Sequence, residues 1–261
     1  ELDFLAALAV FCKKKNPDFW LMGEVVFGDY KEWANSKMLD SVTNYEYHTP
    51  LYESFNHRDF GKISRVLQRQ FGADGVYKRL NMYTFVDNHD VERAASVLSE
   101  PAHLYPLYLL LFTLPGIPAI YYGSEWGFEG KIRNGKHHEL RPKVNLKNVD
   151  TLAKHPLLID SIKRFTAFRS TTNALSEGDY QELFVTNEQL VFARVKEHNF
   201  VICMVNASRQ TITLDIPLQQ YEAEGYKDLL NTEYIVKAQN GMLSLEIPSC
   251  WGRVLSPVNL S

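Results

Sequence analysis

Two carboxylates and a histidine are the side chains of this sequence best placed to do chemistry. Glu24 stands inside an apolar run, residues 19–27, where a buried carboxylate is costly unless it is paired or functional. His89 and Asp90 follow a second apolar run, residues 82–86. A carboxyl group in a partly apolar pocket has a raised pKa and can act as a general acid, and glycoside hydrolysis requires two carboxylates flanking the scissile bond. The alternatives are a structural ion pair for Glu24, a helix N-cap for Asp90 and a core side chain for His89.

The segments that carry these residues alternate between helix and strand patterns. The expected helices cover residues 4–15, 60–71, 104–114 and 157–169, and the expected strands cover residues 19–27, 41–45, 82–86 and 117–122. Strands that are apolar on both faces and alternate with helices are typical of parallel βα units. Their average spacing of about 32 residues matches the ~31 residues per unit of a (β/α)8 barrel. We therefore expect an α/β domain that forms half of such a barrel. A doubly wound sheet would give the same alternation, but the glycine-rich phosphate loop that would favour it is missing.

The pattern changes near residue 175. Short strand signals then cover residues 180–185, 190–196, 200–206, 211–216, 234–238 and 242–247, with turn signals between them. The sequence thus predicts a barrel domain over residues 1–174 and an all-β sandwich domain over residues 175–261.

Composition narrows the class of function. The chain has 261 residues, with 28 basic and 31 acidic side chains, and no basic run longer than three lysines. This balance argues against nucleic acid and against a polybasic membrane anchor as partners. Aromatic residues make up 13% of the chain, which suits flat neutral ligands such as sugars but equally an aromatic-rich core. The three widely spaced cysteines predict neither a disulfide framework nor a zinc site and favour a reducing, cytoplasmic compartment.

Two further segments have features of a membrane span or of a metal site. Residues 104–124 carry no charge, but the sequence Pro115-Gly116-Ile117-Pro118 divides them into a buried helix and a buried strand, so no membrane span is expected. The neighbours His137, His138 and Glu139 have no further ligand at a metal-binding spacing. The sequence therefore predicts no metal and no cofactor.

Three motifs resemble those of the α-amylase family of glycoside hydrolases, family 13. Phe19-Trp20-Leu21-Met22-Gly23-Glu24-Val25 resembles the fifth-strand motif of that family. Phe85-Val86-Asp87-Asn88-His89-Asp90, with Arg93, resembles the seventh-strand motif, and Pro115-Gly116-Ile117-Pro118-Ala119-Ile120-Tyr121-Tyr122-Gly123, with Glu125, resembles the eighth strand. The resemblance covers roughly residues 1–172 and implies the second, C-terminal half of the barrel, followed by the family's C-terminal β domain.

The resemblance also implies a role for each matched residue. Glu24 would be the general acid/base, and Asp90 would stabilise the oxocarbenium-like transition state and bind sugar hydroxyls. His89 would bind the sugar, while Arg93 and Asn88 would be structural residues near the site. The implied substrate is a maltooligosaccharide or another α-glucan, cleaved at α-1,4 bonds with retention.

The family's nucleophile, an aspartate at the end of the fourth strand, has no counterpart in this chain. Leu2-Asp3-Phe4 resembles the segment that follows the nucleophile motif, so the nucleophile and the N-terminal half of the barrel are expected to precede Glu1. Val91 and Ser124 stand where the family often has Thr and Asp, which leaves the subfamily open. A chain without the nucleophile is expected to be inactive alone.

Four alternative functions stay open at this point. They are a transglycosidase, a relative acting on trehalose or sucrose, a catalytically inactive barrel serving as a binding subunit, and a carbohydrate-binding β module. The β domain has a single tryptophan, Trp251, so the sequence does not indicate an aromatic platform there. Calcium dependence, endo or exo action, oligomeric state and secretion are not determined by these residues.

Overall fold

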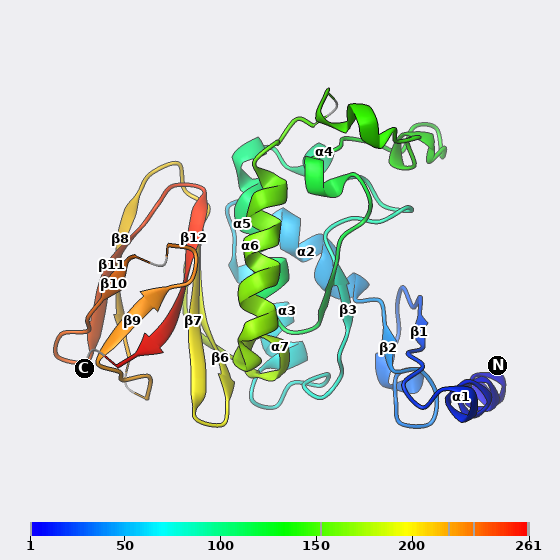
Figure 1. Cartoon of the computed structure of the whole chain (residues 1–261), viewed down its shortest axis with the longest axis horizontal. Helices are drawn as coiled ribbons and strands as arrows, with labels where there is room; N and C mark the ends of the chain where they lie inside the picture. Colours follow the sequence, from blue (N-terminus) through cyan, green and yellow to red (C-terminus); the bar gives the residue numbers. More distant parts are fainter. Residues whose placement is uncertain (1, 152, 219, 232, 260–261) are drawn as a thin grey trace.

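The computed structural model of the chain describes residues 2–151, 153–218, 220–231 and 233–259 (Figure 1). The α-helices are α1 (Leu2–Lys15), α2 (Tyr45–Asn56), α3 (Gly61–Phe71), α4 (Ala94–Val97), α5 (Leu104–Thr113), α6 (Leu158–Thr171) and α7 (Asn173–Glu177). Short 3-10 helices are η1 (Tyr30–Glu32), η2 (Pro101–His103), η3 (Ser124–Trp126), η4 (His138–Leu140) and η5 (Leu146–Thr151). Each of the four helices expected from the sequence is present.

Four short strands form the wall of a partial barrel. They are β1 (Met22–Gly23), β2 (Ser41–Val42), β3 (Tyr83–Phe85) and β4 (Ile117–Ala119). β1 pairs with β2 and β3 with β4, both in parallel, and a parallel bridge between Thr43 and Tyr83 joins the two pairs. Spatial order follows chain order, as the wall of a (β/α)8 barrel requires. The predicted half-barrel fold is confirmed.

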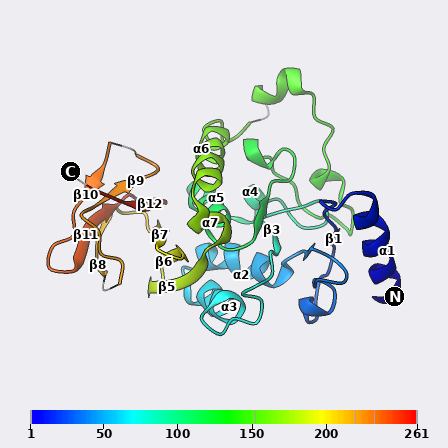
Figure 2. The ribbon, with the colours of Figure 1, turned by 60° about the horizontal axis from the view of Figure 1, so that its bottom comes forward.

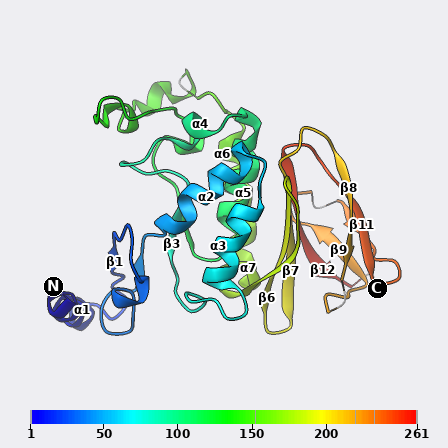
Figure 3. The same cartoon turned by 180° about the vertical axis from the view of Figure 1, so that it is seen from behind.

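The strands are shorter than expected, and one helix was missed. Only two residues of the predicted strand 19–27 pair, because β1 is an edge strand whose one strand partner among the described residues is β2. Helix α2 went unpredicted because Pro50 lies inside it, and a proline normally ends a helix. Its buried side chains, including Tyr47, Leu51 and Phe55, anchor α2 in the core. Figure 3 shows α2 and α3 side by side in front of α5.

The C-terminal part is an all-β unit of two facing sheets. Its strands are β5 (Asp179–Val185), β6 (Gln189–Lys196), β7 (Asn199–Asn206), β8 (Ile212–Pro217), β9 (Gly225–Asp228), β10 (Ile235–Val236), β11 (Met242–Ile247) and β12 (Trp251–Val258). Among the described residues, one antiparallel sheet has the order β10-β9-β12-β7-β6-β5 and a second pairs β8 with β11. The predicted sandwich is thus present, but β9 and the central strand β12 were missed. Gly252 and Pro257 interrupt the sequence pattern of β12.

The six-stranded sheet buries a different face against each neighbour. One face, with Phe192 and Cys203, shares a core with α5 and α6. The opposite face, with Val191 and Met204, packs against Leu245 and other side chains of β8 and β11. Successive side chains of β6 and β7 therefore enter the two cores in turn, so these strands pack the β unit against the partial barrel. Figures 1 and 2 show α5 and α6 between the two parts, with the termini at opposite ends of the molecule.

Two buried arginines bind the C-terminal end of α5. Arg169 of α6 donates to the carbonyl oxygen of Phe112 at 2.7 Å, and Arg194 of β6 donates to that of Thr113 at 2.5 Å and to that of Gly178 at 2.7 Å. Burial lowers the pKa of Arg194 to about 9 and that of Arg169 to about 10, so both stay charged at neutral pH. Cations at this end of a helix satisfy its free carbonyls and complement its dipole.

Candidate active site

The predicted site residues follow strand ends at one edge of the partial barrel. Glu24 comes directly after β1, and Asn88, His89 and Asp90 come after β3, so all lie at the carboxyl ends of parallel strands. Glu24, Asn88 and His89, together with Tyr121 after β4, line one cavity of about 370 Å³. In (β/α)8 enzymes this edge carries the active site. The structure therefore brings together residues that are up to 97 positions apart in the sequence.

A hydrogen-bonded chain connects the two acidic segments. The Tyr45 hydroxyl donates to Oε1 of Glu24 at 2.8 Å and accepts from Nδ2 of Asn88 at 2.9 Å. Oδ1 of Asn88 then accepts from the backbone N–H of Asp90 at 2.7 Å and from that of Val91 at 3.0 Å. Burial raises the pKa of Tyr45 to about 12, so its hydroxyl keeps its proton and orients the carboxylate of Glu24.

Tyr45 was missed in the sequence, although one signal pointed to it. It stands at the end of the predicted strand 41–45, and Glu24 and Asp90 were selected because they lie near strand ends. A tyrosine without a neighbouring motif, however, does not indicate a particular reaction. Its neighbour Thr43 lies just after β2, where its Oγ1 accepts from the N–H of Val25 at 2.9 Å. This bond fixes the backbone on the carboxyl side of Glu24.

The expected burial of Glu24 is wrong for this structure. Glu24 is exposed, as are its near neighbours Met22 and Val26, whereas strand interiors are normally covered on both faces. The reason is that β1 is an edge strand, so the side of Glu24 away from β2 faces open space. Exposure removes the alternative of a buried ion pair for this residue.

One arginine and two histidines surround Asp90. Nη2 of Arg141 donates to its Oδ1 at 2.6 Å, Nδ1 of His137 lies 3.2 Å from the same oxygen, and Nε2 of His89 lies 3.1 Å from Oδ2. Slight burial acts to raise the pKa of Asp90, but the His137 hydrogen bond and the charges of His89 and Arg141 outweigh it and lower the pKa. Asp90 is therefore held ionised. No pattern in the sequence indicated that Arg141 reaches this site.

A buried polar network lies beneath the site. Arg93 is fully buried and donates to the carbonyl of Tyr122 at 2.8 Å, to the hydroxyl of Ser124 at 2.9 Å and to the carbonyl of Leu140 at 2.6 Å. Ser124 in turn donates to Oδ1 of Asp87 at 2.7 Å. Arg93 thus connects the loop after β3 to the loop after β4. Its role as a structural residue of the site stays a prediction.

The neighbouring carboxylate Asp87, and not Asp90, meets the start of a helix. Oδ2 of Asp87 accepts from the N–H of Ala94, the first residue of α4, at 2.9 Å. The N-cap residue of α4 is Arg93, so the helix-cap alternative for Asp90 is wrong. Burial raises its pKa, against the lowering effect of these hydrogen bonds and of Arg93.

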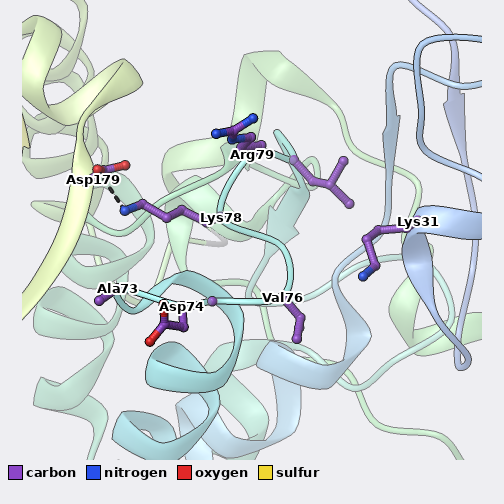
Figure 4. Close-up of a pocket in the computed structure, with 9 residues that line it drawn as sticks. Lys31, Ala73, Asp74, Val76, Lys78, Arg79 and Asp179 are labelled. Carbon is purple, nitrogen blue, oxygen red and sulfur yellow. Dashed lines mark ion pairs between the residues drawn. The ribbon is translucent and has the colours of Figure 1, made fainter.

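Among the described residues, no group of three or more His, Cys, Asp or Glu side chains is arranged to bind a metal ion, and no helix is long and apolar enough to span a membrane. A larger cavity, of about 680 Å³, lies near the amino end of β3 (Figure 4). It is lined by Lys31, Lys78 and Arg79, and Lys78 is ion-paired with Asp179 at 3.0 Å. None of the predicted site residues faces it.

Comparison with known families agrees with this arrangement. The family described as "Alpha amylase, catalytic domain" matches residues 1–190, and "Neopullulanase-like, C-terminal domain" matches residues 180–252. A partial barrel with acidic strand ends, followed by a β sandwich, thus defines an α/β-barrel protein with a C-terminal β domain. The chain belongs to the α-amylase family.

Individual relatives cover the chain at low identity. A cyclomaltodextrinase of Geobacillus thermopakistaniensis (strain MAS1) is 25% identical over 211 residues, which are 79% of this chain and 34% of that protein. A maltogenic alpha-amylase of Bacillus acidopullulyticus is 24% identical over 237 residues, which are 88% of this chain and 39% of that protein. The chain therefore spans between a third and two fifths of these relatives.

Solved structures show the same fold. An Anoxybacillus alpha-amylase superposes with a TM-score of 0.84 at 22% identity, covering 99% of this chain and 57% of that one. An alpha-amylase from Geobacillus thermoleovorans, complexed with acarbose, superposes with a TM-score of 0.80 at 20% identity, covering 100% of this chain and 58% of that one.

Proposed function

We propose that this chain carries the acid/base part of a retaining α-glucan hydrolase that acts on α-1,4-glucosidic bonds of maltooligosaccharides. The observation that carries the proposal is the joint placement of Glu24, oriented by Tyr45, and the ionised Asp90 at one edge of a family-typical barrel wall. Relatives named cyclomaltodextrinase and maltogenic alpha-amylase support α-glucans as the substrate class.

The proposed mechanism is double displacement. Glu24 donates its proton to the glycosidic oxygen as the bond from that oxygen to the anomeric carbon breaks. A carboxylate nucleophile, which the family resemblance assigns to a segment preceding Glu1, forms the glycosyl-enzyme bond. Glu24 then takes a proton from water, and the resulting hydroxide displaces the enzyme carboxylate with net retention. Asp90 stabilises the positive charge of both transition states, and His89 binds the sugar.

The proposed partner of this chain is the remaining half of the barrel. The apolar side chains of Phe4 and Phe11 in α1 and of Phe27 after β1 are exposed, and β1 is the strand at the open edge of the wall. An apolar surface of this kind normally packs against another element. Residues 1–174 and 175–261 are the proposed domains, in keeping with the two matched families.

Kinetics of the 261-residue chain and of the full-length enzyme test this proposal. The full-length enzyme should hydrolyse 4-nitrophenyl α-maltoside, and the chain alone should not, because it lacks the nucleophile. Glu24→Gln in the full-length enzyme should lower kcat by at least about 1,000-fold. Azide should partly restore turnover of an activated substrate by Glu24→Ala, releasing α-glycosyl azide. Turnover by the chain alone, or full activity of Glu24→Gln, would refute the assignment.

A transglycosidase is the second candidate function, because a cyclomaltodextrin glucanotransferase from Bacillus sp. (strain 38-2) is 27% identical over 54% of this chain. Product analysis separates the two. Glucose and maltose as main products indicate hydrolysis, whereas longer or cyclic oligosaccharides indicate transfer. If the intact barrel binds maltooligosaccharides but does not turn them over, the function that fits is that of an inactive binding subunit.

A further inference from the structure

A further cavity, different from the two described above, lies where the partial barrel meets the β sandwich. Its volume is about 530 Å³, within the range of small-molecule sites. Tyr105 from the first turn of α5, Trp251 at the start of β12, Glu100 before η2 and Arg209 after β7 line it. None of these residues belongs to the candidate active site.

Two aromatic rings are part of the lining of this junction cavity. The ring centroids of Tyr105 and Trp251 lie 6.0 Å apart, and the rings are tilted by 53°. Both side chains are partly exposed. Trp251 is the single tryptophan of the β domain, and no motif in the sequence links it to a tyrosine 146 positions earlier. The platform is therefore built across the two parts of the chain.

Polar groups of both kinds stand beside the rings. Nη2 of Arg209 and Oε2 of Glu100 form an ion pair at 2.7 Å. This pair offers donors and acceptors at the same place and leaves no net charge, which favours a neutral ligand with hydroxyl groups over an anion or a cation. A sugar ring has an apolar face for the aromatic rings and a hydroxyl edge for the ion pair.

The cavity wall is held rigidly. Nε2 of His103 is 2.8 Å from the carbonyl oxygen of Ala207, and the N–H of Cys250 donates to the carbonyl of Ser208 at 3.0 Å. Cys250 also has a left-handed backbone, with φ of 47°, which is uncommon for a side chain of this kind. Strained residues persist where the surroundings impose them, often at binding sites. A rigid wall reduces the entropic cost of binding.

We propose that this junction cavity is a second carbohydrate site, which binds an α-glucan chain on the Tyr105–Trp251 platform away from the candidate active site. The choice of α-glucan rests on the proposed function, whereas the site itself rests on the cavity. Unlike the candidate active site, it is complete within this chain. The 261-residue chain should therefore bind maltooligosaccharides even if it hydrolyses none.

Calorimetric titration of the chain with maltoheptaose tests the proposal. Trp251→Phe keeps an aromatic ring for packing but reduces the platform, and Arg209→Ala changes an exposed side chain. Each should weaken binding by about fivefold or more, since loss of one good contact corresponds to roughly 1 kcal/mol. Trp33→Phe, a matched change outside the cavity, should leave binding unchanged, and so should the double variant Glu24→Gln/Asp90→Asn.

The outcomes separate this site from the proposed function. Unchanged binding in both Trp251→Phe and Arg209→Ala would overturn the site, as would loss of binding in the Glu24→Gln/Asp90→Asn variant. Absence of any binding by the chain, with maltoheptaose hydrolysed by the full-length enzyme, would overturn the site and leave the function intact. Binding of cellohexaose in place of maltoheptaose would overturn the α-glucan assignment.

Discussion

Stability of this chain should fall steeply between pH 7 and pH 5 because of one buried histidine. His48 of α2 is 6% exposed, its ring stacks on Phe85 with centroids 5.2 Å apart, and its Nε2 lies 3.1 Å from the carbonyl oxygen of Val86. Burial lowers the pKa of His48 from 6.5 to about 4, despite the opposing hydrogen bond. The folded state therefore keeps this side chain neutral at a pH where the unfolded state protonates it.

The sign and size of the effect follow from proton linkage. Below pH 6.5 the unfolded state binds a proton that the folded state does not, so stability is lost as pH falls toward 4. The full shift corresponds to about 3 kcal/mol, of which about 2 kcal/mol falls between pH 7 and pH 5. Other groups also titrate in this window, so the quantity of interest is the difference between wild type and His48→Gln.

Urea denaturation followed by circular dichroism at pH 7 and pH 5 measures this difference. The free energy of unfolding of wild type should drop by about 2 kcal/mol more than that of His48→Gln, which retains an amide donor for Val86. Equal losses in the two proteins, within about 0.5 kcal/mol, would show that His48 does not titrate with a lowered pKa and would refute the reasoning.

Three other substitutions test packing, the buried network and the site. Gly252→Ala would place a methyl group 2.2 Å from the carbonyl oxygen of Met204, so we expect a loss of more than about 2 kcal/mol in urea denaturation. Arg93→Lys cannot reach its three acceptors with one ammonium group, and thermal unfolding should show a loss of at least about 2 kcal/mol; an unchanged Tm would contradict the network. Tyr45→Phe removes the hydroxyl that orients Glu24, and in the full-length enzyme kcat should fall about tenfold while stability changes by less than about 1 kcal/mol. An unchanged kcat would show that this hydroxyl does not orient the acid.

The sequence predicted the parts of the fold that have a simple period. The helices α3 and α6 bury residues at helical spacing, and the strands β6 and β7 are short apolar runs between turn signals, so the pattern alone located them. Helix α2 was not predicted because Pro50 argues against a helix in the local sequence. In the folded chain, the packing of its buried side chains stabilises the helix in spite of the proline. Strand β12 was also not predicted. Its Gly252 weakens the strand pattern in the sequence, but the fold requires a glycine there because a side chain would collide with the carbonyl oxygen of Met204.

The candidate site was predictable only where a strand end coincides with a motif. Glu24, His89 and Asp90 satisfied both conditions. Arg141 lies 51 positions beyond Asp90 in an irregular loop, and only the folded chain shows that its guanidinium reaches that carboxylate. The exposure of Glu24 depends on which strands lie beside β1, which is a property of the assembled wall and not of the local sequence.

The arginine contacts at the end of α5 have a consequence for how this chain folds. Arg194 belongs to β6, yet it satisfies the last carbonyl of a helix that lies 81 residues earlier in the sequence. The helix is therefore completed only after the sheet has formed, and removing the sheet leaves the carbonyl of Thr113 without this donor in a buried position. The partial barrel and the β sandwich should melt as one cooperative unit. A chain that stops near residue 174 would then be a partly folded, protease-sensitive intermediate, and translation past β6 becomes the step that commits the barrel helices to their final packing.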